Sequence, residues 1–354
     1  MVGASFGSVY VGRDLPLLRA CRRETTSFTP VWLMRQAGRY LPEYRAVRDR
    51  FTFLDLCKTP EAAAEVTLQP VELLGVDAAI LFADILLPLE PLGLGLSFGP
   101  GEGPRIERPL RTAADVAALP VVDCADALSF VLETIRIVRR ELGDRTPLIG
   151  FAGAPFTLAS YAIEGGGSRD YRQTKRLLLG EPETWHALMT RFVDLTASYL
   201  EAQIMAGAEA VQLFDSWVGH LAPIDYRQSV LPHMQTLLAR LARSGVPVIH
   251  FATGTSGLLE DMAAAGGDVI SVDWRIDLRT AWQRIGSSRA IQGNLDPLVL
   301  AAPAHVIRER VRELLAQAEG RPGHIANLGH GLLPEIPVDG VRCFVDAVHE
   351  LSAR

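Results

Sequence analysis

Eight apolar runs of strand length recur along the chain, and this pattern constrains the fold more than any other feature. The runs are 30–35, 78–82, 147–152, 210–215, 247–252, 269–274, 289–293 and 324–328. They are apolar throughout, as is typical of strands that are buried on both faces of a parallel sheet. Amphipathic stretches that predict helices separate them, at 60–75, 126–142, 182–207, 228–244 and 303–318. We therefore predict an α/β protein, a single-domain (β/α)8 TIM-type barrel over residues 15–354, preceded by an N-terminal tail at 1–14.

A doubly wound open sheet is the alternative, because it shows the same alternation of strands and helices. A length of 354 residues suits either two domains of ordinary size or one large barrel. No linker rich in Ser, Gly and Pro divides the chain, which favours a single domain. The Gly-rich stretch 92–104 does not run from a strand into a helix, so we predict a hairpin excursion there and not a phosphate loop. We expect the run 165–168 to be a mobile loop.

The composition excludes several classes of protein. Hydrophobic residues make up 48% and charged residues 21%, which is typical of an ordered globular protein and not of a disordered chain or a coiled coil. The net charge of −6 argues against a general nucleic-acid or membrane-surface partner. No apolar run reaches ~18 residues, and the first dozen residues lack a basic signal-peptide segment. The four cysteines are widely spaced without a CxxC pair, which favours a reducing, cytoplasmic location.

Polar residues follow most of the predicted strands at the point where each strand ends. In a parallel barrel the C-terminal ends of the strands build the active site. We therefore expect the active site at this face, formed by residues from at least five strands. The polar residues at these ends are Arg35, Arg39, Asp84, Tyr161, Asp215, Ser216, Asp273, Asn294, Asp296 and His330.

Structural roles remain open for several of these residues. Asp84 and Asp215 are also suited to capping a helix, and Tyr161 to packing in a core. Arg35 and Arg39 follow an apolar strand in a Gly-containing turn, where guanidinium groups can grip carboxylates or phosphates in a bidentate manner. The same pair is compatible with a solvated surface.

The motifs of metal and nucleotide chemistry are missing from the sequence. There is no HExxH, Walker A or dinucleotide-binding pattern, no GxSxG nucleophile elbow follows a predicted strand, and His250 has no soft ligand two residues on. We expect neither a catalytic metal nor a cofactor. Lys58 and Lys175 are the only lysines, and neither lies at a predicted strand end, which disfavours a Schiff-base mechanism.

Five sequence blocks resemble the uroporphyrinogen decarboxylase family, and they occur in the family's order. They are PVWLMRQAGRYLPEYR (30–45), GFAGAPFTLASYAIEGGGS (150–168), LFDSWVGHL (213–221), QGNLDP (292–297) and NLGHGLLPEIP (327–337). The resemblance extends from about residue 15 to the end of the chain. The segment HFATGTSGLLEDM (250–262) departs from it, because it lacks the lysine and glycine run of some bacterial relatives. Residues 1–14 match no part of the family that we can place.

The resemblance implies a cytoplasmic homodimer that needs no cofactor or metal and has no nucleic-acid or membrane partner. Its substrate would be a small-molecule tetrapyrrole. The expected reaction converts uroporphyrinogen III to coproporphyrinogen III by decarboxylating four acetate side chains. The implied catalytic residues are Asp84, Arg35, Tyr161 and His330. The implied substrate-binding residues are Arg35, Gln36, Ala37, Gly38, Arg39, Arg48, Asp84, Tyr161, Ser216 and His330.

Two other functions fit parts of the sequence. Methyltransferases of the same superfamily, linked to cobamide or folate, use zinc with a His-x-Cys pattern, whereas His250 has Ala252 at that offset. A tetrapyrrole carrier that had lost turnover would keep the pocket, although the presence of Asp84 and Arg35 argues against it.

Overall fold

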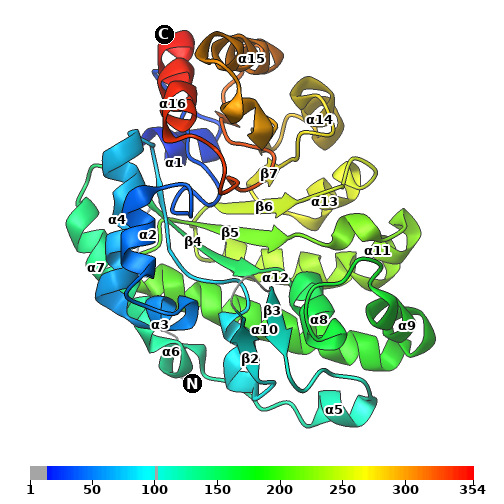
Figure 1. The fold of residues 1–354 in the computed structure, drawn as a ribbon. Helices are drawn as coiled ribbons and strands as arrows, with labels where there is room; N and C mark the ends of the chain where they lie inside the picture. The colour runs from blue at the N-terminus through cyan, green and yellow to red at the C-terminus, as the bar shows by residue number, and fades with distance from the viewer. Residues whose placement is uncertain (1–13, 100–102) are drawn as a thin grey trace.

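A curled sheet of seven parallel strands forms the centre of the protein (Figure 1). The computed structural model describes residues 14–99 and 103–354, so the predicted tail at 1–14 lies almost wholly outside the described residues. The strands are β1 (Ala79–Ile80), β4 (Leu148–Gly153), β5 (Ala210–Asp215), β6 (Val248–Ala252), β7 (Val269–Ser271), β8 (Ala290–Gln292) and β9 (His324–Ile325). Their order in the sheet follows the chain, and every neighbouring pair is parallel. Seven of the eight predicted strands are thereby confirmed, with shorter bounds at several ends.

The prediction of a strand over 30–35 is wrong. This segment makes one isolated parallel bridge, from Val31 to Ala326 beside β9. Side chains bind the backbone N–H groups that a ladder would use, because Val31 donates to the Asp77 carboxylate at 2.7 Å and Met34 to the Asn327 side chain at 3.3 Å. The chain then turns at Arg35, whose φ is 61°. The regular strands therefore form an open curled sheet, and no eighth strand closes it within the described residues.

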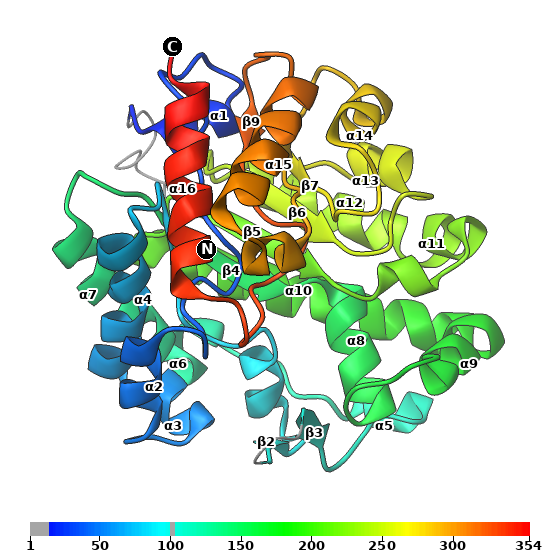
Figure 2. The same cartoon turned by 45° about the horizontal axis from the view of Figure 1, so that its top comes forward.

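Helices surround the sheet, as Figures 1 and 2 show from two directions. The shorter ones are α1 (Pro16–Cys21), α2 (Pro42–Arg48), α3 (Phe53–Lys58), α5 (Ala113–Ala117), α6 (Cys124–Ala127), α8 (Pro155–Glu164), α9 (Arg172–Gly180), α11 (Pro223–Ser229), α13 (Leu259–Ala265), α14 (Leu278–Ile285) and the 3-10 turns η1 (Leu87–Leu92), η2 (Val218–His220) and η3 (Pro297–Ala301). The longer ones are α4 (Pro60–Leu74), α7 (Ser129–Leu142), α10 (Pro182–Ala206), α12 (Leu231–Ala242), α15 (Ala304–Gln317) and α16 (Val338–Ser352). Even α10, with 25 residues, lacks the apolar character for crossing a membrane, and so does every other helix in the described part of the chain.

Local sequence explains where the helices begin and end. Prolines occupy the first turns of α4, α8 and α10, where a missing N–H costs no hydrogen bond. Gly75 and Gly165 end α4 and α8 in the left-handed conformation that glycine adopts most easily. Two predicted helices, 126–142 and 228–244, are each broken in two, at Leu128 and at Val230. The other three predicted helices are confirmed.

The predicted hairpin excursion after the second run is confirmed. Strands β2 (Leu96–Phe98) and β3 (Pro104–Ile106) pair antiparallel to each other and stand apart from the main sheet. The described ends of the Gly-rich stretch therefore belong to a hairpin, while residues 100–102 lie outside the described part. This excursion takes up length that a minimal barrel does not need.

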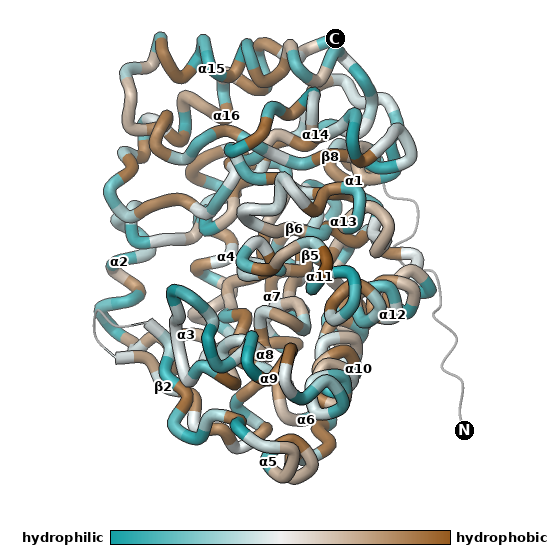
Figure 3. Tube along the Cα trace, turned by 90° about the vertical axis from the view of Figure 1, so that its right-hand side faces the viewer, coloured by the Kyte–Doolittle hydropathy of each residue, from teal (hydrophilic) through white to brown (hydrophobic). Residues whose placement is uncertain are grey.

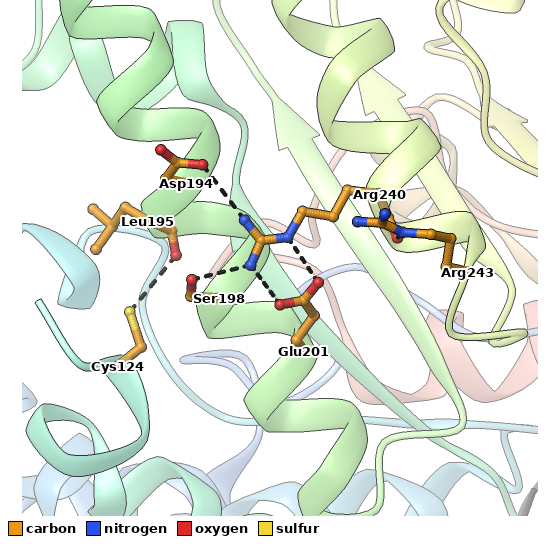
Figure 4. Close-up of polar contacts among 7 residues, drawn as sticks. All are labelled: Cys124, Asp194, Leu195, Ser198, Glu201, Arg240 and Arg243. Atoms are coloured by element: carbon orange, nitrogen blue, oxygen red, sulfur yellow. Dashed lines mark hydrogen bonds and ion pairs between the residues drawn. The ribbon is translucent and has the colours of Figure 1, made fainter. Parts of the chain in front are cut away.

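Amphipathic faces and one ion cluster hold the helix layer together. In Figure 3, α15 alternates between hydrophobic and hydrophilic stretches, as expected for a helix with one face on the core. Figure 4 shows Arg240 of α12 between polar side chains of α10. Its Nε and Nη2 atoms donate to the two carboxylate oxygens of Glu201 at 2.8 and 2.6 Å. This bidentate pair links α10 and α12.

A buried polar layer crosses the hollow of the curled sheet. Gln292 of β8 accepts from Trp32 Nε1 at 2.9 Å, and its own Nε2 donates to Gln212 of β5 at 3.0 Å. Two strands lie between β5 and β8 in the sheet, so this contact is possible only across the concave side. Gln212 therefore marks the inward face of β5. Phe214 shares this face, and Asp215 lies on the outward face, because side chains alternate along a strand.

We expect Trp32→Phe to lower the free energy of unfolding by about 1–3 kcal/mol, because it leaves the buried Gln292 oxygen without its donor. Chemical denaturation followed by circular dichroism measures the change. Val121→Ser is the control, since that side chain is 87% exposed. A loss no larger than that of the control would contradict the structural importance of the layer.

Candidate active site

The predicted site residues lie in the loops at the C-terminal ends of the strands, which we call the rim. Asp84 follows β1, Tyr161 lies on α8 directly after β4, Ser216 follows β5 and His330 follows β9. Arg35 lies in the turn that follows the single bridge of Val31. Parallel strands bring all these ends to one edge, so residues far apart in sequence share one face.

The turn at 35–39 is held from below by Gln36. This side chain is fully buried; its Nε2 donates to the Ala78 carbonyl at 3.0 Å and its Oε1 accepts from Leu33 N–H at 3.0 Å. Its backbone carbonyl accepts the Tyr40 hydroxyl at 2.6 Å. Gln36 therefore shapes the loop through both ends of its amide. Arg35 and Arg39 on either side of it are exposed, and Ala37 and Gly38 are partly buried.

The Arg35 side chain crosses the loop that follows β9. A Cβ atom on Gly331 would lie 2.5 Å from Arg35 Cδ, so only glycine permits this approach. A Cβ on Gly329 would lie 2.4 Å from the Trp274 backbone nitrogen. These two glycines pack the His330 loop against both the first turn and the loop after β7. The His330 ring meets Trp274 edge to face, with ring centroids 6.4 Å apart.

Asp84 is partly buried, and its surroundings disfavour the charged form of its carboxyl group. One carboxylate oxygen accepts the Leu86 N–H at 2.8 Å, a local turn of the kind that also caps helices. Burial raises the pKa of Asp84 from 3.8 to about 6, against the opposing effects of the Leu86 N–H and the Arg35 guanidinium. Near neutral pH this carboxyl group therefore carries a charge that its surroundings disfavour.

Arg35 also acts on Tyr161 and His330. Burial, followed by the Asp84 carboxylate, raises the pKa of Tyr161 to about 12, and Arg35 opposes this rise. Burial and then the Arg35 charge lower the pKa of His330, which favours its neutral form. The four predicted catalytic residues thus share one electrostatic environment, although they come from four separate loops.

Arg39 and Arg48 gather on the opposite side of the first turn, near Tyr44. Both guanidinium groups oppose the rise that burial causes in the pKa of Tyr44. Arg48 donates to the Phe51 carbonyl, and the Tyr44 ring packs on Phe82, two residues before Asp84, at 5.7 Å. Ser216 is partly buried, and its backbone carbonyl accepts the Thr253 hydroxyl at 2.7 Å.

Sequence reasoning missed an aromatic row on the inward face of the sheet. Phe214 of β5 and Phe251 of β6 are in register, and Phe151 of β4 is in register with Gln212. Neighbouring rings are 5.5 and 5.7 Å apart in edge-to-face contacts. All three rings share the inward face with Gln212, and Phe214 and Phe251 lie two residues closer to the C-terminal strand ends. The row provides an apolar wall below the polar loops. The spacing of Phe214 from Gln212 and of Phe251 from Ile249 was the available signal, hidden within uniformly apolar runs.

The Asp215 carboxylate, for which a capping role was open, lies beside His250 instead. Asp215 Oδ2 and His250 Nε2 are 3.6 Å apart, and both side chains are fully buried. Asp273 pairs with Arg275 at 2.7 Å. Among residues 14–99 and 103–354, no group of three or more His, Cys, Asp or Glu side chains is arranged to hold a metal ion.

The fold and the rim define an α/β enzyme of parallel strands with its polar site at their C-terminal ends. The structure of a methyltransferase from Methanosarcina mazei shares this fold, with a TM-score of 0.79 and 21% sequence identity over 95% of this chain and 97% of that one. The family model described as uroporphyrinogen decarboxylase (URO-D) matches residues 13–351, so the chain belongs to that family. The uroporphyrinogen decarboxylase of Carboxydothermus hydrogenoformans is 58% identical over 95% of this chain and 96% of its own length. That of Sorangium cellulosum is 58% identical over 94% and 95%.

We expect Asp84→Asn to stabilise the protein near neutral pH. The raised pKa means that the carboxyl contributes its full stability below pH 3.8 and loses it as the pH rises through about 6. Asparagine keeps an oxygen for the Leu86 N–H without the charge, so the gain at pH 8 should be about 1–2 kcal/mol, discounted for partial exposure. Thermal melts of parent and variant at pH 4 and pH 8 measure it. A gain of equal size at both values would contradict the shift.

Proposed function

We propose that the chain decarboxylates the four acetate side chains of uroporphyrinogen III to give coproporphyrinogen III, without a cofactor. Membership of the uroporphyrinogen decarboxylase family supports this reaction. The observation at the site that carries it is the joint placement of Asp84 and Arg35 above the aromatic row. An amphipathic tetrapyrrole needs an apolar wall for its rings, cations for its carboxylates and an acceptor for its pyrrole N–H groups. The rim supplies all three.

Loss of CO2 leaves an electron pair that requires an acceptor, and we assign that role to the substrate's own pyrrole ring. A proton added to a ring carbon makes the ring iminium-like. The bond between the acetate methylene and its carboxylate then breaks, CO2 leaves and its electrons enter the ring. A proton delivered to the methylene carbon and loss of the ring proton give the methyl group. The net change per acetate is uptake of one proton and release of one CO2.

Asp84 stabilises this cationic ring as a carboxylate. Its charge is disfavoured in the free protein, as its pKa of about 6 records, and a cation or a set of N–H donors beside it would favour the charged form. Fixed charges aimed at developing charge typically contribute ~3–4 kcal/mol to the transition state. Tyr161, whose pKa of about 12 keeps it protonated, donates a hydrogen bond. His330, held neutral, both donates and accepts.

The arginines bind the carboxylate side chains. Arg35, Arg39 and Arg48 lie around one turn, and their guanidinium groups suit bidentate contacts with acetates and propionates. Ala37 and Gly38 shape the backbone between them, Gln36 supports that turn from below, and Ser216 adds a hydroxyl. A guanidinium is a poor acid, so proton delivery by Arg35 is a secondary role.

We also propose that the sheet forms a closed (β/α)8 barrel in which the segment 30–35 takes the first position. The hydrogen bonds on both sides of it support this, because Ala326 N–H donates to Pro30 and Asp77 N–H to Val31, both at 2.8 Å. A homodimer follows from the family resemblance, as does a cytoplasmic location. The four free thiols of Cys21, Cys57, Cys124 and Cys343 are consistent with a reducing compartment.

The test of the function is anaerobic incubation of the purified chain with uroporphyrinogen III, followed by chromatographic counting of the remaining carboxyl groups. We expect products with seven to four carboxylates, and an unchanged substrate would refute the function. Asp84→Asn should keep the fold and lower turnover by about 10²-fold or more, because it removes the charge that favours the cation. Asp126→Asn, an exposed site on α6, is the control. Turnover of Asp84→Asn within about threefold of the parent would exclude the assigned role.

Arg35→Ala should weaken binding of coproporphyrinogen by about 10- to 100-fold, the value of one or two lost charge-assisted hydrogen bonds. Anaerobic isothermal titration calorimetry measures the affinity. Arg172→Ala serves as the comparison, because that side chain is 83% exposed on α9 and removes the same charge from elsewhere on the surface. Equal affinities for the two variants would contradict a binding role for Arg35.

A further inference from the structure

A buried acid–base pair lies behind the rim and takes no part in the chemistry described above. Asp215 is the last residue of β5, and His250 lies on the neighbouring strand β6. Asp215 Oδ2 and His250 Nε2 are 3.6 Å apart, and neither side chain has any exposed surface. Both groups can be charged, and both lie close to residues that we assign to the site.

The pair lies on the outward face of the sheet, between strands and helices. Gln212 and Phe214 face inward, so the alternation of side chains turns Asp215 outward. His250 shares this face, because it is in register with Leu213, two residues before Asp215. The pair therefore cannot touch a substrate on the concave side. It faces α8 and Tyr226 of α11 instead.

Asp215 connects two substrate-facing segments. Its Oδ1 accepts the hydroxyl of Thr157, a fully buried residue in the first turn of α8, at 3.4 Å. Tyr161 lies four residues further along, on the same side of that helix. At the other end, Asp215 directly precedes Ser216 and Trp217, and the Trp217 ring meets Tyr161 at 5.9 Å. Helix α8 and the β5 loop are thus joined twice, by Thr157 to Asp215 inside and by Tyr161 to Trp217 at the rim.

Stability alone is a weak reason for such a pair. Burial of two ionisable groups costs solvation that their attraction rarely recovers in full, and apolar replacements of similar volume are often no less stable. Burial also raises the pKa of Asp215, an effect that His250 and Thr157 oppose. The link from Thr157 to Asp215 favours one geometry, because a hydrogen bond is directional and an unpaired polar group is costly in the interior.

We propose that Asp215 is a positioning residue, which holds α8 through Thr157 so that Tyr161 and Ser216 face the bound tetrapyrrole. The inference rests on the proposed function for the identity of the substrate. A shift of about 1 Å at a reacting centre can cost about 10²-fold in rate without greatly changing affinity.

The experiment compares the decarboxylation kinetics of the parent with those of Asp215→Asn, Thr157→Val and Thr157→Ser. Asp215→Asn should lower kcat by about 10- to 100-fold and change KM by less than about threefold. Thr157→Val should lower kcat in the same sense, and Thr157→Ser, which keeps the hydroxyl, should restore it. Glu209→Gln is the matched control, because Glu209 is a buried carboxylate paired with Arg139 at 2.9 Å just before the opposite end of the same strand. It should leave kcat unchanged even if it lowers the melting temperature.

Two results would overturn the inference. One is a kcat for Asp215→Asn close to that of the parent, and the other is an equal fall in kcat for Asp215→Asn and Glu209→Gln, which would indicate a general loss of stability. If Asp215→Asn does not fold, the two Thr157 variants test the inference. Equal kcat values for Thr157→Val and Thr157→Ser would overturn the inference. If the parent does not act on uroporphyrinogen, the proposed function fails on its own. Hydrogen–deuterium exchange of the α8 amides then decides the inference, which requires faster exchange in Thr157→Val than in Thr157→Ser.

Discussion

The close approach of Arg35 to the loop after β9 is the contact on which the arrangement of the rim depends. It requires a left-handed backbone at Arg35 and the absence of a side chain at Gly331. A guanidinium stays protonated at any physiological pH, so it is a fixed charge for the groups around it. Asp84, Tyr161 and His330 all respond to it. The charge of Arg35 thereby influences the pKa of three residues that are far apart in the sequence.

Desolvation outweighs this cation at Asp84, and the imbalance is functionally useful. A carboxylate fully satisfied by Arg35 would have little left to offer to a substrate. Burial outweighs the Leu86 N–H and the Arg35 guanidinium and raises the pKa of Asp84 to about 6, so its charge is only partly compensated before a ligand arrives. A cationic or N–H-rich ligand would complete that compensation. Part of the stability of the folded chain is thus given up at a position where the charge is needed.

The sequence was sufficient to predict the order of elements but not how the sheet begins. Seven apolar runs form strands that pair in parallel with their neighbours in chain order. The run at 30–35 is as apolar as the other seven, yet the Asp77 and Asn327 side chains accept hydrogen bonds from its backbone N–H groups. Both residues lie far from this run in the sequence. Gln36 was assigned to substrate binding from the resemblance, and its buried amide also holds the turn. Composition cannot distinguish a side chain that touches a ligand from one that supports its neighbour.

The same limit explains why the pairing of Asp215 with His250 behind the site was not predicted. Asp215 and His250 lie in runs that periodicity describes only as buried, and their pairing depends on the register between β5 and β6. The outward direction of Asp215 follows from Gln212, whose partner Gln292 is 80 residues away. Contacts of this kind depend on sheet curvature, which sets what meets across the hollow. Polar residues at the strand ends therefore predict which edge of the sheet carries the site. The register between strands determines which of these residues point toward the site.

Net charge is a poor guide to the ligand of this protein for a related reason. The chain carries −6 overall, yet Arg35, Arg39, Arg45 and Arg48 lie within one short segment beside the rim. Interactions between exposed charges are largely screened beyond about 8–10 Å at physiological ionic strength, so distant acidic residues contribute little there. Under the proposed function, a polycarboxylate that enters the rim would meet the local arginines first and the aromatic row below them next. That arrangement would separate the two parts of an amphipathic ligand, with its charged groups at the rim and its rings against Phe151, Phe214 and Phe251.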